Sequence, residues 1–456
     1  MQWMELIRIP SVREPAVGDA PFGLASKQAM DTAASYFAEQ GFDIRTEEEN
    51  YYALARWENG PKTIGIFGHC DVVTAGEGWL YTSPFEPIIK DGYLIGRGSL
   101  DDKSGVMASL AAMRILKELK IPFKSSIQAF IGPAEESRMP DIHRFAEKEE
   151  MPDVSLVPDS HFPCGVGEKT ILRFTAKRNT PFNEVLDFAG GKSMNIVLDR
   201  VTVTLRKVKG LAEELQALVA GKKEYELEVG EVLTLTAIGV PRHAGYPEGS
   251  VNATALAADL LKECKCLCAE DRACMEQLSL WLGDYYGGGY GLAFVDSDFG
   301  KLTAANGIVA VEEGCMTFTT DIRFGSELNH LEAEERLTKL MEESGWKMTY
   351  MHNRPGFKVP KDNPMPDRFT AIYHELTGSD AKPYFMSGGT YSRALKNAFT
   401  VGAWAPDPDS KSIPPELPAG HGGAHQKDEC ISIDSHFQAV RVLVHYLLAC
   451  DEYLNQ

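Results

Sequence analysis

The chain has 456 residues, of which 44% are hydrophobic and 24% charged, and its formal net charge is −19 at pH 7. At about 150 residues per domain, this length predicts two or three globular domains. The strong negative charge repels nucleic-acid phosphates and anionic membrane surfaces, so we expect neither as a partner. The sequence shows no apolar signal segment near residue 1 and no run of about 18 apolar residues, which favours a cytoplasmic protein.

The sequence contains nine cysteines, and this odd number argues against a disulfide framework. One group lies close together in sequence: Cys264, Cys266, Cys268 and Cys274. Its C-x-C-x-C spacing differs from the C-x-x-C spacing that is typical of structural zinc sites. We therefore expect reduced cysteines there rather than a metal site.

The first 60 residues predict a short helix, a second helix over 24–40 that ends at Gly41, and strands over 42–45 and 51–57. Four further short strands share one pattern, in which a buried-looking strand leads into a loop with acidic or histidine side chains. They are 64–67, before His69 and Asp71; 93–95, before Asp101; 127–131, before Glu135 and Glu136; and 154–157, before Asp159. Since ligands collect outside the carboxyl ends of strands in open α/β sheets, we expect one shared site at the edge of one sheet. A helix over 103–119, apolar on one face, is expected to cover that sheet.

The pattern changes after Asp159. Strands and helices alternate over the next stretch, with strands at 171–176, 200–206, 232–239 and 316–323 and helices at 252–268 and 331–344. We therefore predict an inserted α+β domain over 166–353 and a discontinuous α/β domain over 1–165 and 354–456. The second part of the α/β domain contains helices at 366–376 and 434–450, a glycine-rich turn at 388–389 and an exposed loop at 407–423.

The motifs that end these strands have ordinary structural explanations as well as functional ones. In His69-x-Asp71 the carboxylate can orient the histidine ring for metal binding, but the motif taken alone favours a core histidine beside an acid. The doubled acid Asp101-Asp102 can bridge two metals, or it can cap the helix that follows.

In Glu135-Glu136 one glutamate can bind metal while the other acts as a general base, although the pair taken alone favours a solvated acidic turn. Asp159 and His425 add a carboxylate and an imidazole to the set. Together these donors are the types expected around zinc, cobalt or manganese. We interpret His421 as a flexible surface histidine and not as a ligand.

In combination, the motifs resemble the M20 metallopeptidase family, and most of all its PepV-type dipeptidases. The matching pieces follow in order over nearly the whole chain: HCDVV, GRGSLDDKSG, PAEES, VPDSHFP, HAGYPEGSVNA, TDIRF, GGTYSR and AHQKDE. The resemblance implies a dizinc-exopeptidase-like catalytic domain with a mixed sheet between helices, and an inserted lid domain over 166–353.

The resemblance also implies roles for individual residues. His69 and Asp159 would hold one zinc ion, Glu136 and His425 the other, and Asp101 would bridge them. Glu135 would be the catalytic base, and Asp71 would orient a ligand. Cobalt or manganese could replace zinc in such a site.

Further implied roles fall on the predicted lid and on the glycine-rich turn. His243 would stabilise the oxyanion that forms during the reaction. Residues that would bind the substrate carboxylate are Arg323, Asn306, Gly388, Gly389, Thr390 and Arg393. The resemblance further implies a cis peptide bond between Asp101 and Asp102.

The chain departs from the family pattern at Ser104 and Thr170, where glycine is usual, at Gly245, where serine is commoner, and at Thr74, where proline is usual. None of these changes removes an expected ligand or the base. Ser104, however, could alter the turn beneath Asp101.

We therefore expect a zinc-dependent exopeptidase that hydrolyses dipeptides with a free carboxyl end. The alternative within enzymes is an N-acyl-amino-acid deacylase or desuccinylase, and a different class is a non-catalytic relative. The large lid, by its resemblance to PepV-type members, implies a monomer.

Overall fold

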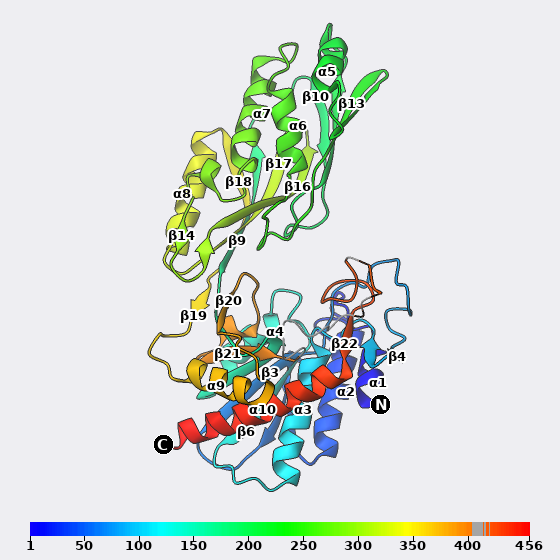
Figure 1. Ribbon diagram of the computed structural model, residues 1–456. Coiled ribbons are helices and arrows are strands. Elements are labelled where there is room, and N and C mark those ends of the chain that lie inside the picture. Colours follow the sequence, from blue (N-terminus) through cyan, green and yellow to red (C-terminus); the bar gives the residue numbers. More distant parts are fainter. Residues whose placement is uncertain (404–413, 415, 419) are drawn as a thin grey trace. The chain divides into compact units, whose positions relative to one another are not determined.

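The computed structural model describes residues 1–403, 414, 416–418 and 420–456 (Figure 1). These residues form two compact units. The first comprises Met1–Gly167, Val359–Tyr384 and Gly389–Gln456, and the second comprises Glu168–Lys358 and Phe385–Gly388. The loop predicted at 407–423 lies largely outside the described residues. The division into folding domains at 1–165 with 354–456 and at 166–353 stays a prediction.

The first unit is an α/β structure. Its helices are α1 (Gln2–Ile7), α2 (Leu24–Glu39), α3 (Lys103–Glu118), α4 (Pro140–Lys148), α9 (Met365–Thr377), η2 (Tyr391–Ala394) and α10 (Ile433–Leu454). Its strands are β1 (Asp43–Thr46), β2 (Ala53–Trp57), β3 (Thr63–His69), β4 (Ile88–Lys90), β5 (Tyr93–Ile95), β6 (Ser126–Gly132), β7 (Val154–Ser160), β21 (Ala398–Gly402) and β22 (Cys430–Ser432). Three short strands lie where the chain passes from one unit to the other: β8 (Gly165–Glu168), β19 (Phe357–Lys358) and β20 (Tyr384–Met386).

The main sheet of the first unit has the strand order β1-β2-β6-β3-β7-β21-β8. Strand β3 runs parallel to β6 and β7, and β7 runs parallel to β21, whereas β1, β2 and β6 pair antiparallel. The central strands are almost fully buried, as expected for strands covered on both faces. This sheet confirms the predicted α/β class with a mixed sheet between helices.

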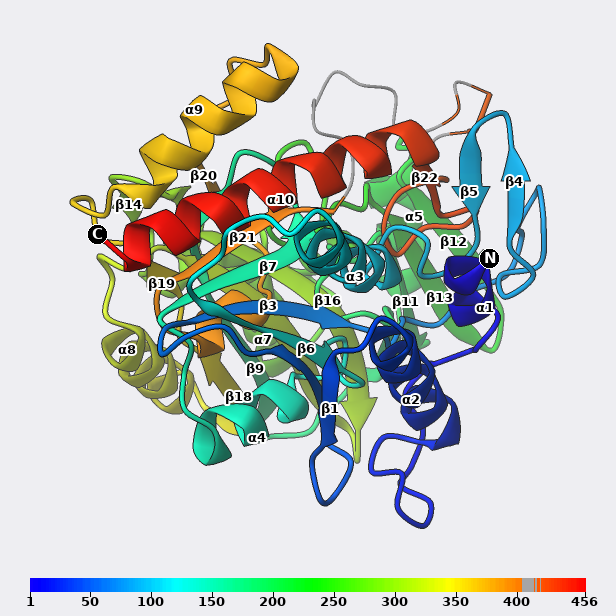
Figure 2. The same ribbon diagram turned by 90° about the horizontal axis from the view of Figure 1, so that it is seen from below.

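Helices cover both faces of this sheet. Phe67 of β3 packs edge-to-face on Phe145 of α4, with ring centroids 5.4 Å apart, in a buried aromatic cluster. The next residue, Gly68, points to the opposite face because successive strand residues alternate. A Cβ atom there would lie 3.0 Å from Val106 of α3, so α3 packs directly on the strand. Figure 2 shows α10 beside α3, away from α4.

One strand of the predicted sheet belongs elsewhere. Strand β5, expected to stand beside the others that lead into acidic loops, forms a separate three-stranded sheet in the order β22-β5-β4. It pairs antiparallel with both neighbours, and Cys430 lies opposite Ile95. The expectation of one sheet for all four strands was therefore wrong for β5. Local sequence showed that the strand is buried but not which strand it pairs with.

The second unit has the α+β composition that was predicted. Its helices are α5 (Leu211–Val219), α6 (Ala253–Leu261), α7 (Ala269–Leu282), η1 (Gly288–Tyr290) and α8 (His330–Glu343). Its strands are β9 (Thr170–Arg178), β10 (Val185–Ala189), β11 (Arg200–Arg206), β12 (Tyr225–Val229), β13 (Val232–Ile238), β14 (Val295–Asp296), β15 (Gly300–Lys301), β16 (Thr303–Glu312), β17 (Cys315–Phe324) and β18 (Trp346–Arg354).

These strands form two antiparallel four-stranded sheets, in the orders β16-β17-β9-β18 and β10-β11-β13-β12, and the short hairpin β14-β15. One continuous apolar core joins them, with Trp281 and Trp346 packed edge-to-face at 5.6 Å. The predicted helix over 252–268 ends at Leu261; Cys264, Cys266 and Cys268 follow it in turns, and Cys274 lies in α7. All nine cysteines are free. Within the described residues, no helix combines the length and apolar character that crossing a membrane requires.

Candidate functional site

Parallel strands bring the first group of candidate residues to one edge of the main sheet. His69 is the last residue of β3, Glu135 and Glu136 follow the end of β6, and Asp159 lies near the end of β7. Because β6, β3 and β7 are neighbours and run in the same direction, their carboxyl ends meet at this edge.

Two other segments complete the group. Asp101 lies in the loop between β5 and α3, and Asp102 caps α3 by accepting a hydrogen bond from the Gly105 backbone N–H at 3.1 Å. The peptide bond between Asp101 and Asp102 is cis, as the resemblance implied. His425 comes from the segment before β22 and has a positive φ of 63°.

The Asp101 carboxylate lies between the two histidines. Its Oδ1 is 3.2 Å from His69 Nε2, and its Oδ2 is 3.0 Å from His425 Nε2. His425 Nε2 is also 2.8 Å from Glu136 Oε1. Asp101 therefore directs one oxygen to each histidine, which is the arrangement that a bridging ligand needs.

Donor atoms within 4.8 Å of one another form two groups in this part of the structure: His69, Asp102 and Asp159, and Asp101, Glu136 and His425. Asp102 was not among the expected ligands. Its two oxygens already accept hydrogen bonds from the backbone N–H groups of His69 and Gly105, at 3.3 and 3.1 Å. Asp102 therefore holds the backbone of β3 and α3 as well as facing the site.

Buried charge makes this group a good fit for divalent cations. His69 is 1% exposed, and its Nε2 lacks a hydrogen bond although Asp101 lies within 3.2 Å. Burial and neighbouring carboxylates raise the pKa of Asp102, Glu135 and Asp159 well above the usual range. Burial opposes ionisation of Asp101 too, but contacts with His425 and His69 hold its pKa below its ordinary value. So many buried carboxylates repel one another unless cations compensate them, and imidazole with carboxylate is a donor set that suits zinc.

Asp71 connects the histidine to the loop that carries the glutamates. Its Oδ1 accepts a hydrogen bond from Glu135 N–H at 2.9 Å, and its Oδ2 accepts one from Glu136 N–H at 3.1 Å. His69 Nδ1 lies 3.3 Å from the Asp71 carboxylate and 3.1 Å from the Asp71 carbonyl oxygen. Both oxygens of Asp71 thus set the position of the Glu135–Glu136 backbone, and its carbonyl orients the ring of His69.

Sequence reasoning missed a second acid that holds this loop. Asp141 is completely buried at the start of α4 and accepts hydrogen bonds from Ala134 N–H at 2.9 Å and from the Tyr391 hydroxyl at 2.5 Å. The Tyr391 ring also packs edge-on against His69, with centroids 6.2 Å apart. Tyr391 lies in the GGTYSR motif, so its sequence signal was present without a role assigned to it.

Sequence reasoning also missed the ion pair of Arg97 and Glu429. Arg97 donates to Glu429 Oε2 at 2.5 Å, and both side chains are at most 1% exposed. Glu429 Oε1 accepts hydrogen bonds from three backbone N–H groups of one loop: Gly98, Leu100 and Asp101. The available signal was the position of Glu429 four residues after His425, in AHQKDE.

His421 corrects one expectation. Its side chain is 14% exposed, and its Nδ1 lies 2.5 Å from Asp428 Oδ2, so it is not a flexible surface histidine. Asp428 is fully buried and also accepts hydrogen bonds from the backbone N–H groups of Leu80 and Tyr81.

Ser104 stands where the resembling family usually has glycine. Its hydroxyl donates a hydrogen bond to the Leu100 carbonyl at 2.6 Å, within the turn beneath Asp101.

Three predicted site residues, His243, Asn306 and Arg323, lie in the 168–358 segment of the second unit. His243 Nδ1 accepts a hydrogen bond from Gly245 N–H at 3.2 Å. Arg323 of β17 is 2% exposed, pairs with Asp321 at 2.9 Å and donates to the Ser387 carbonyl at 2.6 Å. Asn306 of β16 bonds inside the unit, to Thr254 Oγ1 and to the Ile308 and Thr319 carbonyls.

The predicted glycine-rich turn spans the boundary of the units. Gly388 belongs to the second, and Gly389, Thr390 and Arg393 belong to the first. The Arg393 guanidinium lies over Gly389, where a Cβ atom would stand 2.3 Å from its Nη2. Thr390 caps η2 by accepting a hydrogen bond from Ser392 N–H.

Comparison with known proteins adds independent evidence. The model of peptidase family M20/M25/M40 matches residues 65–449. A protein of Staphylococcus aureus strain USA300 named "Putative dipeptidase" is 28% identical over 98% of this chain and 96% of its own length. A protein of Staphylococcus haemolyticus with the same kind of name is 28% identical over 96% of this chain and 93% of its own length.

Solved structures share the fold at low sequence identity. Human carnosine dipeptidase 1 has a TM-score of 0.59 at 14% identity, over 99% of this chain and 95% of that chain. A tripeptidase from Staphylococcus aureus has a TM-score of 0.57 at 16% identity, over 99% of this chain and 97% of that chain. Since the family model covers most of its length, the chain belongs to peptidase family M20/M25/M40.

Proposed function

We propose that this peptidase is a metal-dependent exopeptidase that hydrolyses dipeptides with a free carboxyl end. The observation that carries the proposal is the Asp101 carboxylate, which directs one oxygen to His69 and the other to His425. The relatives named as dipeptidases, which match almost end to end, support the substrate class.

Two zinc ions fit the donor set, with cobalt or manganese as alternatives. His69 and Asp159 would hold one ion, Glu136 and His425 the other, and Asp101 both. When bound, such ions polarise a peptide carbonyl and lower the pKa of water.

Glu135 is the proposed general base. The residue is 8% exposed, and its Oε1 is buried without a hydrogen-bond partner, so this oxygen is free to accept a proton from water. Burial raises its pKa, which makes the carboxylate a stronger base toward water and keeps the proton on the residue until it passes to the leaving nitrogen. Asp71 keeps this residue in place through the backbone N–H of Glu135.

The second unit is proposed to act as the lid. His243 would donate a hydrogen bond where negative charge develops on the carbonyl oxygen, and Arg323 would bind the substrate carboxylate. Gly388, Gly389, Thr390 and Arg393 would contribute to the same carboxylate site. As a donor, Asn306 would take part only by exchanging a present hydrogen bond, because both N–H groups of its amide already donate, to the Ile308 and Thr319 carbonyls. We further propose a monomer, which light scattering would test.

The decisive experiment compares wild type with Glu135→Gln on a panel of dipeptides, N-acetyl amino acids and N-succinyl amino acids, with metal content measured on each sample. We expect dipeptides to be hydrolysed fastest and the variant to lose activity by about 10²–10⁴-fold with its metal content unchanged. Preference for acylated amino acids would indicate a deacylase instead. Full activity of the variant would refute the role of Glu135, and no hydrolysis by metal-loaded wild type would indicate a non-catalytic relative.

A further inference from the structure

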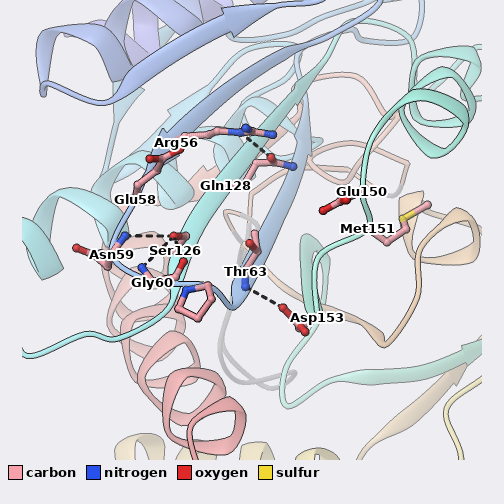
Figure 3. A pocket seen from close by; sticks show the side chains of 11 residues that line it. Arg56, Glu58, Asn59, Gly60, Thr63, Ser126, Gln128, Glu150, Met151 and Asp153 are labelled. Atoms are coloured by element: carbon pink, nitrogen blue, oxygen red, sulfur yellow. Dashed lines mark hydrogen bonds between the residues drawn. The ribbon is translucent and has the colours of Figure 1, made fainter.

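A polar cavity of about 770 Å³ lies in the first unit, at the sheet edge opposite the candidate metal site (Figure 3). Its walls include Thr63 and Ser126, the first residues of β3 and β6, and Asp153, which precedes β7. The candidate ligands His69, Glu136 and Asp159 lie at or just after the other ends of the same strands. The cavity is therefore separate from the proposed catalytic centre, and its volume is in the range of small-molecule sites.

The cavity contains a buried polar group with an unmet hydrogen bond. Gln128 of β6 is 4% exposed, and its Oε1 accepts a hydrogen bond from Arg56 Nε at 2.9 Å. Its Nε2 is buried without a hydrogen-bond partner. Figure 3 shows this nitrogen directed away from Arg56, toward the side of the cavity lined by Glu150 and Met151. A buried amide donor without an acceptor is costly and is normally satisfied.

Strand pairing fixes the surroundings of this side chain. Gln128 lies opposite Arg56 on β2 and opposite Gly65 on β3. The Phe67 ring and Pro152 cover Gly65, where a Cβ atom would lie 2.4 and 2.8 Å from them. Gln128 points to the same face as Phe130, two residues along, which packs against Phe145 of α4. Helix α4 has only nine residues and ends at Lys148. The apolar cluster under α4 therefore does not extend to Arg56 and Gln128, and this end of the same sheet face is polar.

The charges around the cavity are of both signs. The guanidinium of Arg56 stands beside the Gln128 amide, and its Nη2 is 3.8 Å from Glu149. Glu58 and Glu150 line the rim and are exposed. Asp153 is already engaged, by Lys62 at 3.1 Å and by the Thr63 N–H at 2.9 Å. The Gln128 amide and the Arg56 guanidinium can donate hydrogen bonds to a carboxylate. They lie near Glu58 and Glu150, whose carboxylates can pair with a cation.

We propose that this cavity binds a zwitterion that carries an α-carboxylate and an ammonium group, as free amino acids and short peptides do. The carboxylate accepts hydrogen bonds from Gln128 Nε2 and Arg56, and the ammonium group faces Glu58 and Glu150. The proposal does not depend on the catalytic function, because the site shares no residue with the metal group.

Calorimetric titration of the full chain with glycine, L-leucine, L-glutamate and L-lysine tests this proposal. The same titrations are made with Gln128→Leu and Arg56→Met, and with Arg200→Met, an exposed arginine of the second unit, as the matched control. An amino-acid amide, which lacks the carboxylate, and an N-acetyl amino acid, which lacks the ammonium group, probe the two ends of the ligand. A Glu135→Ala background allows dipeptides to be titrated without hydrolysis and separates them from free amino acids as the source of the zwitterion.

We expect binding to weaken by at least about tenfold in both cavity variants and for both blocked ligands, and to stay unchanged in Arg200→Met. Gln128→Met, which keeps the length of the side chain, replaces Gln128→Leu if the latter unfolds. Binding that is equally strong in wild type and in folded cavity variants would place the ligand elsewhere, at the catalytic centre, and overturn the proposal. No binding of any zwitterion to wild type would overturn it as well.

Discussion

The Glu429 carboxylate accepts a hydrogen bond from the backbone N–H of Asp101 at 3.0 Å, although the two residues are 328 positions apart in the chain. The same oxygen accepts the N–H groups of Gly98 and Leu100, and Arg97 supplies the opposite charge. The loop that presents the central aspartate is therefore held from the C-terminal part of the first unit. Glu429 sets where Asp101 lies without facing a histidine itself.

Replacement of Glu429 is expected to affect both stability and activity. Glu429→Leu leaves the buried Arg97 without a counter-ion, which costs about 3–5 kcal/mol of unfolding free energy, and it releases the Asp101 loop. Urea unfolding and dipeptide hydrolysis measure the two effects. The double variant Arg97→Met with Glu429→Leu should recover part of the stability but not the activity, because the backbone N–H groups still lack their acceptor. Wild-type activity in the double variant would refute the positioning role.

Metal removal should inactivate the chain and destabilise it. A ligand that binds only the folded state stabilises it by about 2.7 kcal/mol at 100 times its Kd. Dialysis against a chelator is therefore expected to abolish peptidase activity and lower the Tm, and added zinc, cobalt or manganese should restore both. The matched variant Asp101→Asn should show a much smaller change in Tm on chelation. Persistent activity of metal-free protein would contradict the proposed site.

Gly105 is expected to tolerate no side chain. It lies in the first turn of α3, and a Cβ atom there would stand 2.4 Å from the Pro158 carbonyl oxygen and 2.2 Å from Asp102 Oδ1. Because the Pro158 oxygen belongs to the backbone of β7, Gly105→Ala must push the helix away from the strand that carries Asp159. We expect a loss of about 1–3 kcal/mol, typical of overpacking, measured by urea unfolding. Gly230→Ala, whose nearest atom is 3.6 Å away, is the control and should be nearly neutral.

His436 predicts a specific dependence of stability on pH. Its ring lies 4.3 Å from that of Trp3, and burial lowers its pKa to about 4. Between about pH 6.5 and 4 the unfolded chain binds more protons at this residue than the folded chain, so stability falls as the pH falls through this window. The contribution is on the order of 3 kcal/mol by pH 4.

The variant His436→Gln isolates this contribution. Unfolding free energies of wild type and variant are compared from pH 7 to pH 4, and the advantage of wild type should shrink steadily toward the acidic end. His445→Gln, on an exposed position of the same helix α10, provides the control and should track wild type. A constant difference between wild type and His436→Gln across the pH range would show that folding does not lower the pKa of His436.

Much of the fold followed from local pattern. The apolar runs before His69, Glu135 and Asp159 predicted β3, β6 and β7, because buried central strands of parallel sheets are apolar on both faces. Helical spacing predicted α3. Gly41 predicted the end of α2, which the structure places at Glu39, with Gln40 as the cap residue. The donor types at the strand ends suggested a metal site, and the ordered motifs over nearly the whole chain resembled the family to which the chain belongs.

Pairing between distant segments was beyond local pattern. Nothing near β5 indicates that it pairs with β22 rather than with the main sheet, since periodicity reports burial and not the identity of the partner strand. For the same reason, local sequence patterns did not indicate the contacts of Glu429 with the Asp101 loop, of His421 with Asp428 or of Gln128 with Arg56. The sequence by itself determined which side chains could carry the chemistry and the strands that precede them. Only the tertiary structure decided which backbone groups hold Asp101 and the glutamates, because those hydrogen bonds form between segments that the chain brings together only on folding.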